Sequence, residues 1–503
     1  MVEALIEAPK VAPVAFPPPV TAARQAQPAW SQVPLPQRLA VVRKFRHGLA
    51  EAALDLAATV ESPQRQSTAE TLTAEILPLL DACRFLEQAS AELLAPRRLG
   101  RRRRPIWLLG SRVELRREPL GVVLVIGPSN YPILLPGVQM IQALVAGNAV
   151  VLKPGLGGAA AARAMASELA VAGLPAGVVQ VLGEEKTAAT AAIDQGVDKV
   201  VLTGSATTGR AVLERLAQTG TPAVMELSGS DPVLVLEDAD LELVVAALRF
   251  GLTLNHSFTC IAPRRVYVHR DLAGSLEERL IEELRGLPAR PLPPGAEESL
   301  ANLVGEALAA GARLVVGELP RGGSSAPLVL ADPPSGSAIL AADIAAPVLT
   351  LIPVGSAAEA IELAADCPYR LGAAIFGDTG KARALAQRIP AGVVVINDLI
   401  VPTADPRVPF GGRGDSGFGI TRGAEGLLEM TVSKAVIHRQ DKFRPHYDPP
   451  RAGDDQLFAA YARAVHGTGL AGRFRSLSDL ARLGSSRRRR EQLVKNKRTR
   501  SKK

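Results

Sequence analysis

The sequence predicts an α/β protein built around parallel β-sheets, and three observations support this class. Between residues 121 and 205, short β-branched runs alternate with alanine-rich helical stretches at the spacing of βαβ units. The chain has 503 residues, 47% hydrophobic and 21% charged, which is an ordinary globular composition with enough length for two or three packed units. Only 4% of the residues are aromatic, so Val, Leu, Ile and Ala are expected to fill the interior.

Cysteine usage and hydropathy narrow the class of protein further. Cys83, Cys260 and Cys367 are too few and too scattered for a disulfide framework or a cysteine-based zinc site, which favours a reducing, cytoplasmic compartment. The amino terminus lacks the uninterrupted apolar core of a signal peptide, and no run of about 18 apolar residues predicts a membrane span. The histidines show no metal-ligand spacing, so no metal site is predicted.

The first elements are expected to be helical. Residues 1–29 are rich in Pro and Ala and are expected to form a flexible leader. Apolar residues at helical spacing then predict helices from about 30 to 95. Residues 104–118 alternate around a Gly-Ser turn and predict a β-hairpin.

The next elements are expected to form the first parallel sheet. In such a sheet, ligands bind at the carboxyl ends of the strands, so functional residues are expected in the turns that follow them. The expected strands and their turns are "GVVLVIGP" (121–128), "NAVVLKPG" (148–155), "GVVQVLG" (177–183) and "DKVVLTGS" (198–205).

A helix from about Asp240 separates the two residues most suited to chemistry. Glu226 ends the predicted strand "AVME", and Cys260 lies just beyond the helix. Two loops that flank one helix can meet in space, so the spacing permits a joint site. A second α/β unit is expected from about 260 to 425, with strands at "RRVYVH", "ARLVVG", "PVLTLIPV", "GAAIFG" and "AGVVVIN".

The net charge of +8 is concentrated at the carboxyl end. Residues 487–503 contain ten Lys or Arg and one Glu, which leaves −1 for the rest of the chain. This tail is expected to be a solvated, disordered basic appendage. Weak contact of the tail with a polyanion such as nucleic acid, with an anionic surface or with an acidic partner is the alternative.

Several strand-end motifs occur in the order and at the separations of one enzyme family. The stretches are "GVVLVIGPSNYP" (121–132), "VVLKPG" (150–155), "LTGSATTGR" (202–210), "MELSGSDP" (225–232), "FTCIAPRR" (258–265) and "VPFGGRGDSGFG" (408–419). Taken together, they resemble the aldehyde dehydrogenase superfamily over roughly residues 30 to 440.

The resemblance implies a domain plan. Residues 30–227 would form a Rossmann-type cofactor-binding domain, and residues 228–429 an α/β catalytic domain. The 104–118 hairpin and the strand 430–440 would form a small oligomerisation flap, which implies a homodimer. Residues 441–503 have no counterpart in the family pattern and are expected to be an extra segment, with a helical stretch before the basic tail.

The resemblance also implies the catalytic residues. A thiolate is nucleophilic near neutral pH, and Cys260 matches the family nucleophile that attacks the aldehyde. The side-chain amide of Asn130 and the backbone N–H of Cys260 would stabilise the oxyanion, and Glu226 would activate water to hydrolyse the thioester. The structural alternatives are a small buried hydrophobe for Cys260 and a turn residue for Asn130.

A hydride step requires a nicotinamide cofactor, and the resemblance implies NAD or NADP. Lys153 matches the family lysine that holds the adenosine ribose, although a solvated lysine is the alternative. Gly204 and Ser205 open a helix whose N–H groups suit a pyrophosphate. Pro128, Ser129 and Asp343 are the other residues expected to contact the cofactor.

The sequence departs from the family pattern close to these sites. Leu156 stands where an acidic residue accepts the ribose hydroxyls, which makes NADP as plausible as NAD. Asp343 replaces the usual Glu that holds the nicotinamide ribose. The other departures are Ser257, Phe258, Ser129 and Ala345.

Two other functions stay open. An acylating enzyme of the same fold would pass the thioester to coenzyme A, although Glu226 favours hydrolysis. A catalytically weakened protein would act as a binding or scaffolding component through its basic tail. A dyad of His256 with Cys260 is disfavoured because the family uses no histidine there, and His256 is expected to pack or face solvent.

Overall fold

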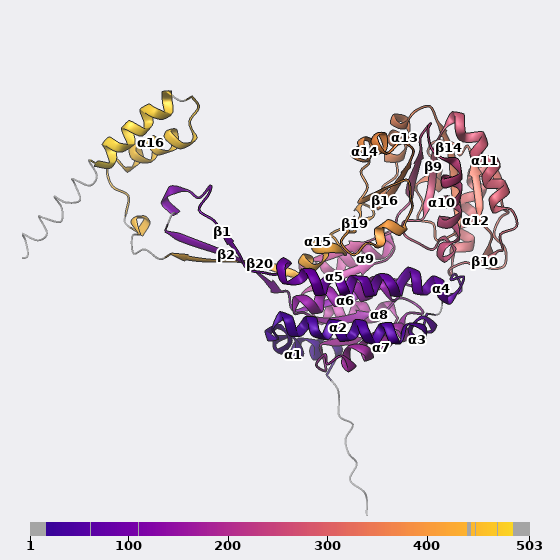
Figure 1. The fold of residues 1–503 in the computed structure, drawn as a ribbon, viewed down its shortest axis with the longest axis horizontal. Coiled ribbons are helices and arrows are strands. Elements are labelled where there is room, and N and C mark those ends of the chain that lie inside the picture. The colour runs from indigo at the N-terminus through magenta and orange to yellow at the C-terminus, as the bar shows by residue number, and fades with distance from the viewer. Residues whose placement is uncertain are drawn as a thin grey trace, which may run out of the picture. The chain divides into compact units, whose positions relative to one another are not determined.

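The computed structural model describes residues 17–60, 62–108, 110–439, 444–447, 449–469 and 471–485. The chain divides into two compact units (Figure 1). The first unit comprises Met1–Leu99 and Val113–Val436, and the second comprises Gly100–Arg112 and Ile437–Lys503. The basic tail 487–503 lies outside the described residues.

The amino-terminal helices begin earlier than the sequence analysis predicted. The expected leader 1–29 is wrong from Pro19 onward, because helix α1 starts there and buries Val20, Ala23 and Trp30. Proline is favourable at the first helical position, so the Pro-rich run before α1 is compatible with a helix start. The amino-terminal helices are α1 (Pro19–Gln32), α2 (Leu35–Glu51), α3 (Ala53–Ala58), α4 (Thr68–Thr71), the π-helical turn η1 (Leu72–Ile76) and α5 (Leu77–Leu93).

The predicted βαβ alternation forms a six-stranded sheet, with the strand order β19-β7-β6-β3-β4-β5. All neighbours are parallel except β19 and β7. The strands are β3 (Val122–Ile126), β4 (Ala149–Lys153), β5 (Val179–Val181), β6 (Lys199–Thr203), β7 (Ala223–Glu226) and β19 (Gly417–Phe418). The helices that connect them are α6 (Leu134–Ala146), α7 (Ala159–Val171), α8 (Lys186–Asp194) and α9 (Ala206–Leu216).

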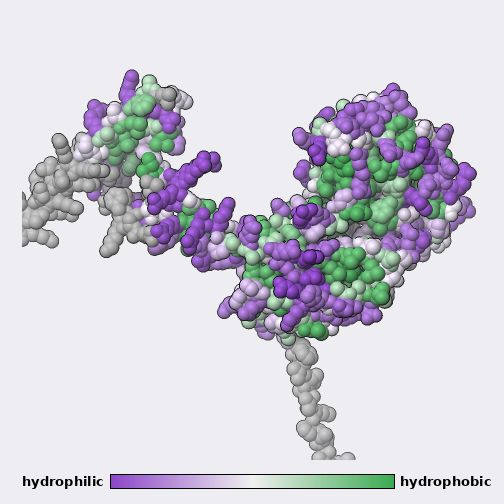
Figure 2. Space-filling model, in the orientation of Figure 1, coloured by the Kyte–Doolittle hydropathy of each residue, from purple (hydrophilic) through white to green (hydrophobic). Residues whose placement is uncertain are grey.

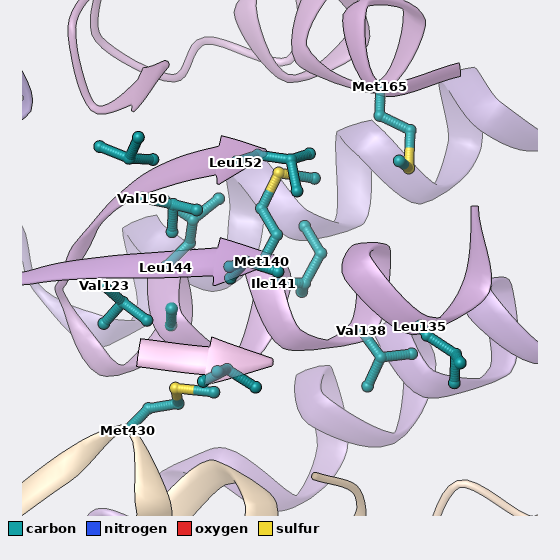
Figure 3. Close-up of a cluster of buried hydrophobic side chains, with 14 of the residues drawn as sticks. Val123, Leu135, Val138, Met140, Ile141, Leu144, Val150, Leu152, Met165 and Met430 are labelled. Atoms are coloured by element: carbon teal, nitrogen blue, oxygen red, sulfur yellow. The ribbon is translucent and has the colours of Figure 1, made fainter. Parts of the chain in front are cut away.

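One large hydrophobic core joins this sheet to the amino-terminal helices. Helix α6 is buried along its whole length and packs between the sheet and α5. Figure 3 shows Met140, Ile141 and Leu144 of α6 lying against Val150 and Leu152 of β4. Apolar side chains from both faces of β3 and β4 are fully buried, as expected for a parallel sheet covered by helices on both sides.

The second α/β part forms a seven-stranded sheet, with the strand order β11-β13-β14-β9-β8-β16-β17. Its strands are β8 (Asp231–Val235), β9 (Pro263–His269), β11 (Arg313–Val316), β13 (Leu328–Ala331), β14 (Val348–Val354), β16 (Gly372–Phe376) and β17 (Val393–Ile396). Its helices are α10 (Leu241–Thr253), α11 (Arg270–Leu284), α12 (Ala296–Ala309), α13 (Ala357–Ala365) and α14 (Thr379–Ala386). Asp240 caps α10 through its carboxylate, which accepts hydrogen bonds from the backbone N–H groups of the first turn.

The chain returns to the first sheet before residue 429. Strand β19 pairs with β7, and helix α15 (Gly423–Glu429) packs against α6. Residues 417–429 therefore pack with the six-stranded sheet, although the predicted catalytic domain 228–429 included them. This return brings the segment after the "VPFGG" signature next to Glu226, since Gly417 is its register partner.

In the predicted hairpin 104–118, the second strand forms, but its partner strand lies earlier in the chain than predicted. Strand β2 (Ser111–Pro119) pairs with β1 (Arg97–Leu99), while Ile106–Leu108 form a 3-10 turn. Arginines do not prevent strand pairing on an exposed edge, so Arg97 and Arg98 can form part of β1. Strand β20 (Thr431–Arg439) completes the sheet order β1-β2-β20 within one chain.

Short elements complete the described chain. These are β10 (Arg290–Pro291), β12 (Ser324–Ser325), β15 (Tyr369–Arg370), β18 (Arg413–Gly414), the 3-10 turns at Leu254–Ser257, Ala338–Ala341, Val401–Ala404 and Pro445–Tyr447, and helix α16 (Asp454–His466). The helix expected in the extra segment is confirmed as α16, and residues 471–485 are helical as well. Among the residues that the structure describes, no helix has the length and apolar character needed to cross a membrane.

Candidate active site

The carboxyl edge of the six-stranded sheet gathers most of the predicted site residues. Lys153 pairs in register with Ile126, the last residue of β3, and Thr203 pairs with Glu226. Because the strands are parallel, the turns that follow β3, β4 and β6 emerge at the same edge. These turns and strand ends carry Pro128, Ser129, Asn130, Lys153, Gly204, Ser205 and Glu226.

The nucleophile loop is held in an unusual backbone conformation. After α10, the consecutive residues Asn255, His256 and Ser257 have φ values of 48°, 49° and 59°, in the left-handed region that side chains disfavour. All three are buried. Such strain persists only where the surroundings enforce it, so the loop that leads to Cys260 is set by its contacts.

Arg264 supplies part of that enforcement. Its buried guanidinium donates hydrogen bonds to the hydroxyl and the carbonyl of Ser257, at 2.7 and 2.6 Å, and to the carbonyl of Ile344 at 2.8 Å. Burial lowers the pKa of Arg264 to about 10. Arg264 thus ties the nucleophile loop to the segment that carries Asp343.

Asn130 contacts the same loop from the sheet edge. The side-chain amide of Asn130 donates a hydrogen bond to the carbonyl of Phe258 at 3.1 Å. The backbone carbonyl of Asn130 accepts hydrogen bonds from the side-chain amide of Asn255 at 3.1 Å and from the guanidinium of Arg65 at 3.0 Å. Next to it, the hydroxyl groups of Tyr131 and Thr259 are 2.8 Å apart. The Asn130 amide is therefore fixed beside the residues that precede Cys260.

A cavity of about 300 Å³ brings the thiol and the carboxylate together. Cys260 and Glu226 both line it, together with the buried Arg422. The other lining side chains are mainly apolar and include Tyr131, Leu134, Leu135, Phe250, Leu254, Ile261, Ile400, Val401 and Phe410.

The carboxylate of Glu226 is buried at the end of β7. Its Oε2 accepts a hydrogen bond from the Thr421 hydroxyl at 2.8 Å, while Oε1 has no hydrogen-bond partner among the described residues. Burial raises the pKa of Glu226, and the nearby charge of Arg422 and the Thr421 hydrogen bond oppose that shift. A carboxylate with a raised pKa and one unengaged oxygen is suited to accept a proton from water.

Cys260 is half-buried in the cavity wall. Burial raises the pKa of its thiol, the charges of Glu226 and Asp231 raise it further, and Arg422 lowers it. Arg422 itself donates to the carbonyl of Thr403 at 2.8 Å, and its guanidinium carbon lies 4.2 Å from the centre of the Phe410 ring. The positive charge of Arg422 thus acts on two groups that must both carry negative charge to react.

The expected cofactor turns pack against one another. A Cβ on Gly155 would lie 2.2 Å from the backbone of Pro128, so only glycine allows this approach. Lys153 is buried, and burial lowers the pKa of its ammonium while Glu184 and Glu185 raise it. Ser205 caps α9 by accepting a hydrogen bond from Thr208 at 3.2 Å.

The structure places a carboxylate beside the turn where Leu156 replaces the family acid. The Glu184 carboxylate accepts hydrogen bonds from the backbone N–H groups of Gly157 at 3.0 Å and Ala159 at 2.7 Å. Leu156 itself is exposed. A lysine, a carboxylate and a helix N-terminus on neighbouring turns have the chemistry to hold a dinucleotide.

Asp343 lies in the segment that leads into β14 of the seven-stranded sheet. Its carboxylate accepts a hydrogen bond from Ser228, two residues beyond Glu226. His256 is buried, and burial lowers its pKa to about 4, since it packs against the segments around Arg290 and Ser325. His256 is therefore packed in the interior, which is one of the two positions expected for it.

Several residues of the site were missed by the sequence analysis. Arg422 and Thr421 directly follow the "VPFGGRGDSGFG" signature, so their position in the chain was a usable signal. Arg264 lies in the quoted stretch "FTCIAPRR", four residues after Cys260, so it too had a usable signal. Glu184 and Arg65 have none that the sequence shows by itself, because they act through contacts with distant turns. Arg65 bonds to Glu75 at 2.8 Å as well as to the Asn130 carbonyl.

Comparisons with known proteins agree with this geometry. The pattern of the Aldehyde dehydrogenase family matches residues 3–436. A 4,4'-diapolycopene aldehyde oxidase from Methylomonas sp is 31% identical over 461 residues, which are 89% of this chain and 86% of that protein. A Mycobacterium tuberculosis aldehyde dehydrogenase solved with NAD+ has a TM-score of 0.77 and 27% identity, over 83% of this chain and 88% of that one. An NADP-dependent enzyme from E. coli has a TM-score of 0.79 and 25% identity, over 84% and 89%.

Proposed function

This chain belongs to the aldehyde dehydrogenase family, and we propose that it oxidises an aldehyde to a carboxylic acid through a covalent intermediate on Cys260. The enzyme is an NAD(P)-dependent oxidoreductase. The observation that carries the catalytic proposal is the cavity of about 300 Å³ whose wall holds both Cys260 and Glu226.

In the first step, the Cys260 thiol gives up its proton and its sulfur forms a bond to the aldehyde carbon. The carbonyl oxygen takes the electron pair of the C=O double bond and becomes an oxyanion. The second N–H of the Asn130 amide and the backbone N–H of Cys260 stabilise that charge, each by about 3 to 4 kcal/mol. The thiol proton passes to solvent water, so Glu226, which faces the same cavity, remains a carboxylate until the hydrolysis step.

Bound at the turns of Lys153 and Ser205, an oxidised nicotinamide cofactor supplies a two-electron hydride acceptor. The residue left on Cys260 is then a thioester. Glu226 takes a proton from water, whose oxygen bonds to the acyl carbon, and the carbon–sulfur bond breaks. The leaving Cys260 thiolate takes the proton that Glu226 removed from water. The products are then a carboxylic acid, the free thiol and the one proton released to solvent in the first step, so atoms and charge balance over the cycle.

The apolar cavity wall indicates the substrate class. Phe250, Leu254, Ile400 and Val401 offer no hydrogen bonds from their side chains, so they favour an aldehyde with an apolar chain. The relative named 4,4'-diapolycopene aldehyde oxidase supports this choice, because its name specifies an aldehyde of a long hydrocarbon.

Glu184 is proposed to set the cofactor preference. A carboxylate beside Lys153 attracts ribose hydroxyls and repels a 2′-phosphate, which favours NAD. We expect Glu184→Gln, which keeps an acceptor oxygen for the turn, to shift the NADP-to-NAD ratio of kcat/KM about tenfold toward NADP, equivalent to about 1.4 kcal/mol. Steady-state kinetics with both cofactors measures this ratio.

The control is Glu185→Gln, which removes the other carboxylate that raises the pKa of Lys153 and leaves the hydrogen bonds of Glu184 to Gly157 and Ala159 in place. An unchanged ratio in Glu184→Gln would contradict the assignment.

Arg422 is proposed to set the pH range of the reaction. It lowers the pKa of both Glu226 and Cys260. Replacing it with Met removes that effect, so both pKa values rise and each group is deprotonated only at higher pH. We expect the acid limb of the pH profile of kcat/KM to move to higher pH in Arg422→Met. Arg413→Met, on an exposed strand, is the matched control and should leave the profile unchanged.

The proposed function is tested by following nicotinamide reduction with a panel of aliphatic and aromatic aldehydes and either NAD or NADP. Activity that rises with chain length supports the apolar substrate class. A requirement for added coenzyme A would favour the acylating alternative. No reduction with any aldehyde, together with no cofactor binding by calorimetry, would favour the scaffold alternative.

Three further features belong to the proposal. The sheet β1-β2-β20 supports a homodimer in which the flap extends a neighbouring sheet, and analytical ultracentrifugation tests it.

The three free cysteines support a reducing, cytoplasmic compartment. The charge of residues 487–503 supports weak contact with a polyanion.

A further inference from the structure

The second unit carries a much larger positive charge than the tail alone. Residues 100–112 and 437–503 contain 23 Lys and Arg and 6 Asp and Glu, a net charge of +17. The whole chain has a net charge of +8, so the remaining residues carry −9. The molecule therefore combines an acidic catalytic unit with a strongly basic second unit.

The same unit exposes large apolar side chains. Ile106, Trp107 and Leu108 form a 3-10 turn that is separated from four consecutive arginines by Pro105 alone, and Trp107 is 57% exposed. On α16, Phe458 is 60% exposed, and in the helical stretch 471–485, Phe474 is 69% exposed. Single exposed apolar side chains are common on protein surfaces, whereas several gathered on one surface are typical of an interaction site.

One contact joins the turn to the carboxyl-terminal segment. The rings of Trp107 and Tyr461 of α16 meet edge to face, with centroids 5.2 Å apart and planes at 67°. The Ile106–Leu108 turn and α16 thus belong to one surface. Figure 2 shows hydrophobic side chains exposed among hydrophilic ones in the region of α16.

Both helical segments have an exposed face with mixed character. On α16, Phe458 and Arg463 are exposed, and so are Asp455 and Gln456 in its first turn. In the stretch 471–485, Phe474 and Leu477 are exposed on neighbouring turns, beside Arg475. Basic residues interleaved with apolar ones on a helix face are typical of helices that lie in a lipid–water interface.

Two kinds of partner, a nucleic acid and an anionic lipid bilayer, have the negative charge to match this unit. Nucleic acid is bound by cations together with flat rings on which bases stack. Here aliphatic side chains are as prominent as rings, since Ile106, Leu108 and Leu477 are all exposed. An anionic bilayer accepts aliphatic and aromatic side chains alike, because both can enter its acyl region. Its acidic headgroups attract the arginines.

We propose that the second unit docks the protein on an anionic phospholipid membrane, with the Ile106–Leu108 turn and the exposed faces of α16 and 471–485 at the interface. The docking does not depend on the catalytic proposal. If the apolar substrate class is right, docking also brings the enzyme to the bilayer into which such an aldehyde partitions.

Intrinsic fluorescence reports on this surface directly, because the chain has only two tryptophans. Trp30 is buried in the first unit and Trp107 is exposed in the second. Full-length protein is mixed with phosphatidylcholine vesicles that do or do not contain phosphatidylglycerol. We expect the acidic vesicles alone to shift Trp107 emission to shorter wavelength and to quench it when their acyl chains are brominated.

The variant Trp107→Phe retains a ring against Tyr461 and should still sediment with acidic vesicles while losing both spectral changes. If acidic vesicles change the emission of Trp107→Phe as much as that of the parent protein, the Ile106–Leu108 turn does not lie at the membrane interface.

Sedimentation of single variants tests the helix faces. Phe458→Glu and Phe474→Glu should each lower partition onto acidic vesicles about tenfold. The matched control is Leu54→Glu, which places the same charge on a 67% exposed apolar position of the first unit and should bind like the parent protein. Oxidation of a short, water-soluble aldehyde should be unchanged in all three variants, which shows that they are folded.

No sedimentation of the parent protein with acidic vesicles would overturn the proposal. Equal loss in Leu54→Glu would overturn it as well. If single-stranded RNA binds in a salt-sensitive way while vesicles do not, the basic unit is a nucleic-acid surface and the membrane proposal is wrong.

Discussion

Cys260→Ser is expected to lower aldehyde oxidation by on the order of 10⁴-fold or more, because a hydroxyl in the same cavity cannot form the thioester at a useful rate. The substitution removes the reacting sulfur and leaves the cavity, Asn130 and Glu226 in place. Cofactor affinity, measured by titration of protein fluorescence, should be unchanged. The measurement is initial-rate nicotinamide reduction with a saturating aldehyde.

The matched control for this prediction is Cys367→Ala. Cys367 and Cys83 are free and buried, while Cys260 is half-buried in the cavity. Iodoacetamide should therefore modify Cys260 first in the folded protein. Because burial and nearby carboxylates raise the pKa of Cys260, its alkylation should accelerate as the pH rises. Full activity in Cys260→Ser would exclude the covalent mechanism.

Glu226→Gln is expected to lower steady-state turnover by about 10²- to 10⁴-fold while acylation of Cys260 still occurs. Glutamine keeps an oxygen that can accept the Thr421 hydrogen bond but cannot take a proton from water. The acyl group should therefore accumulate on Cys260. Mass spectrometry of the protein after mixing with aldehyde and cofactor detects the added mass.

Two controls separate hydrolysis from general damage at Glu226. Hydroxylamine attacks a thioester without a base and should restore turnover in Glu226→Gln, with little effect on the parent enzyme. In the parent enzyme, burial raises the pKa of Glu226, so turnover should increase as the pH rises through that pKa and the carboxylate forms. The variant should lose this dependence. No acyl adduct in Glu226→Gln would place the carboxylate in an earlier step.

Much of the fold could be predicted because local sequence patterns describe it. Buried strands such as β3 and β4 are continuous β-branched runs, and the residues that follow them stand at the sheet edge by the geometry of parallel pairing. Asp240 marks the start of α10 through its capping side chain. Errors arose where composition was misleading, as with the Pro-rich segment that becomes α1 from Pro19 onward.

Local periodicity and motifs place Cys260, Glu226, Asn130 and Lys153 at strand ends and in loops. The groups that surround these residues are set by packing between distant parts of the chain. Thr421 reaches Glu226 across 195 positions, and Arg65 reaches Asn130 across 65. The physical reason is that pKa values and loop strain depend on burial and on charges brought close by packing, and the return of the chain through β19 and α15 is not encoded in any local pattern.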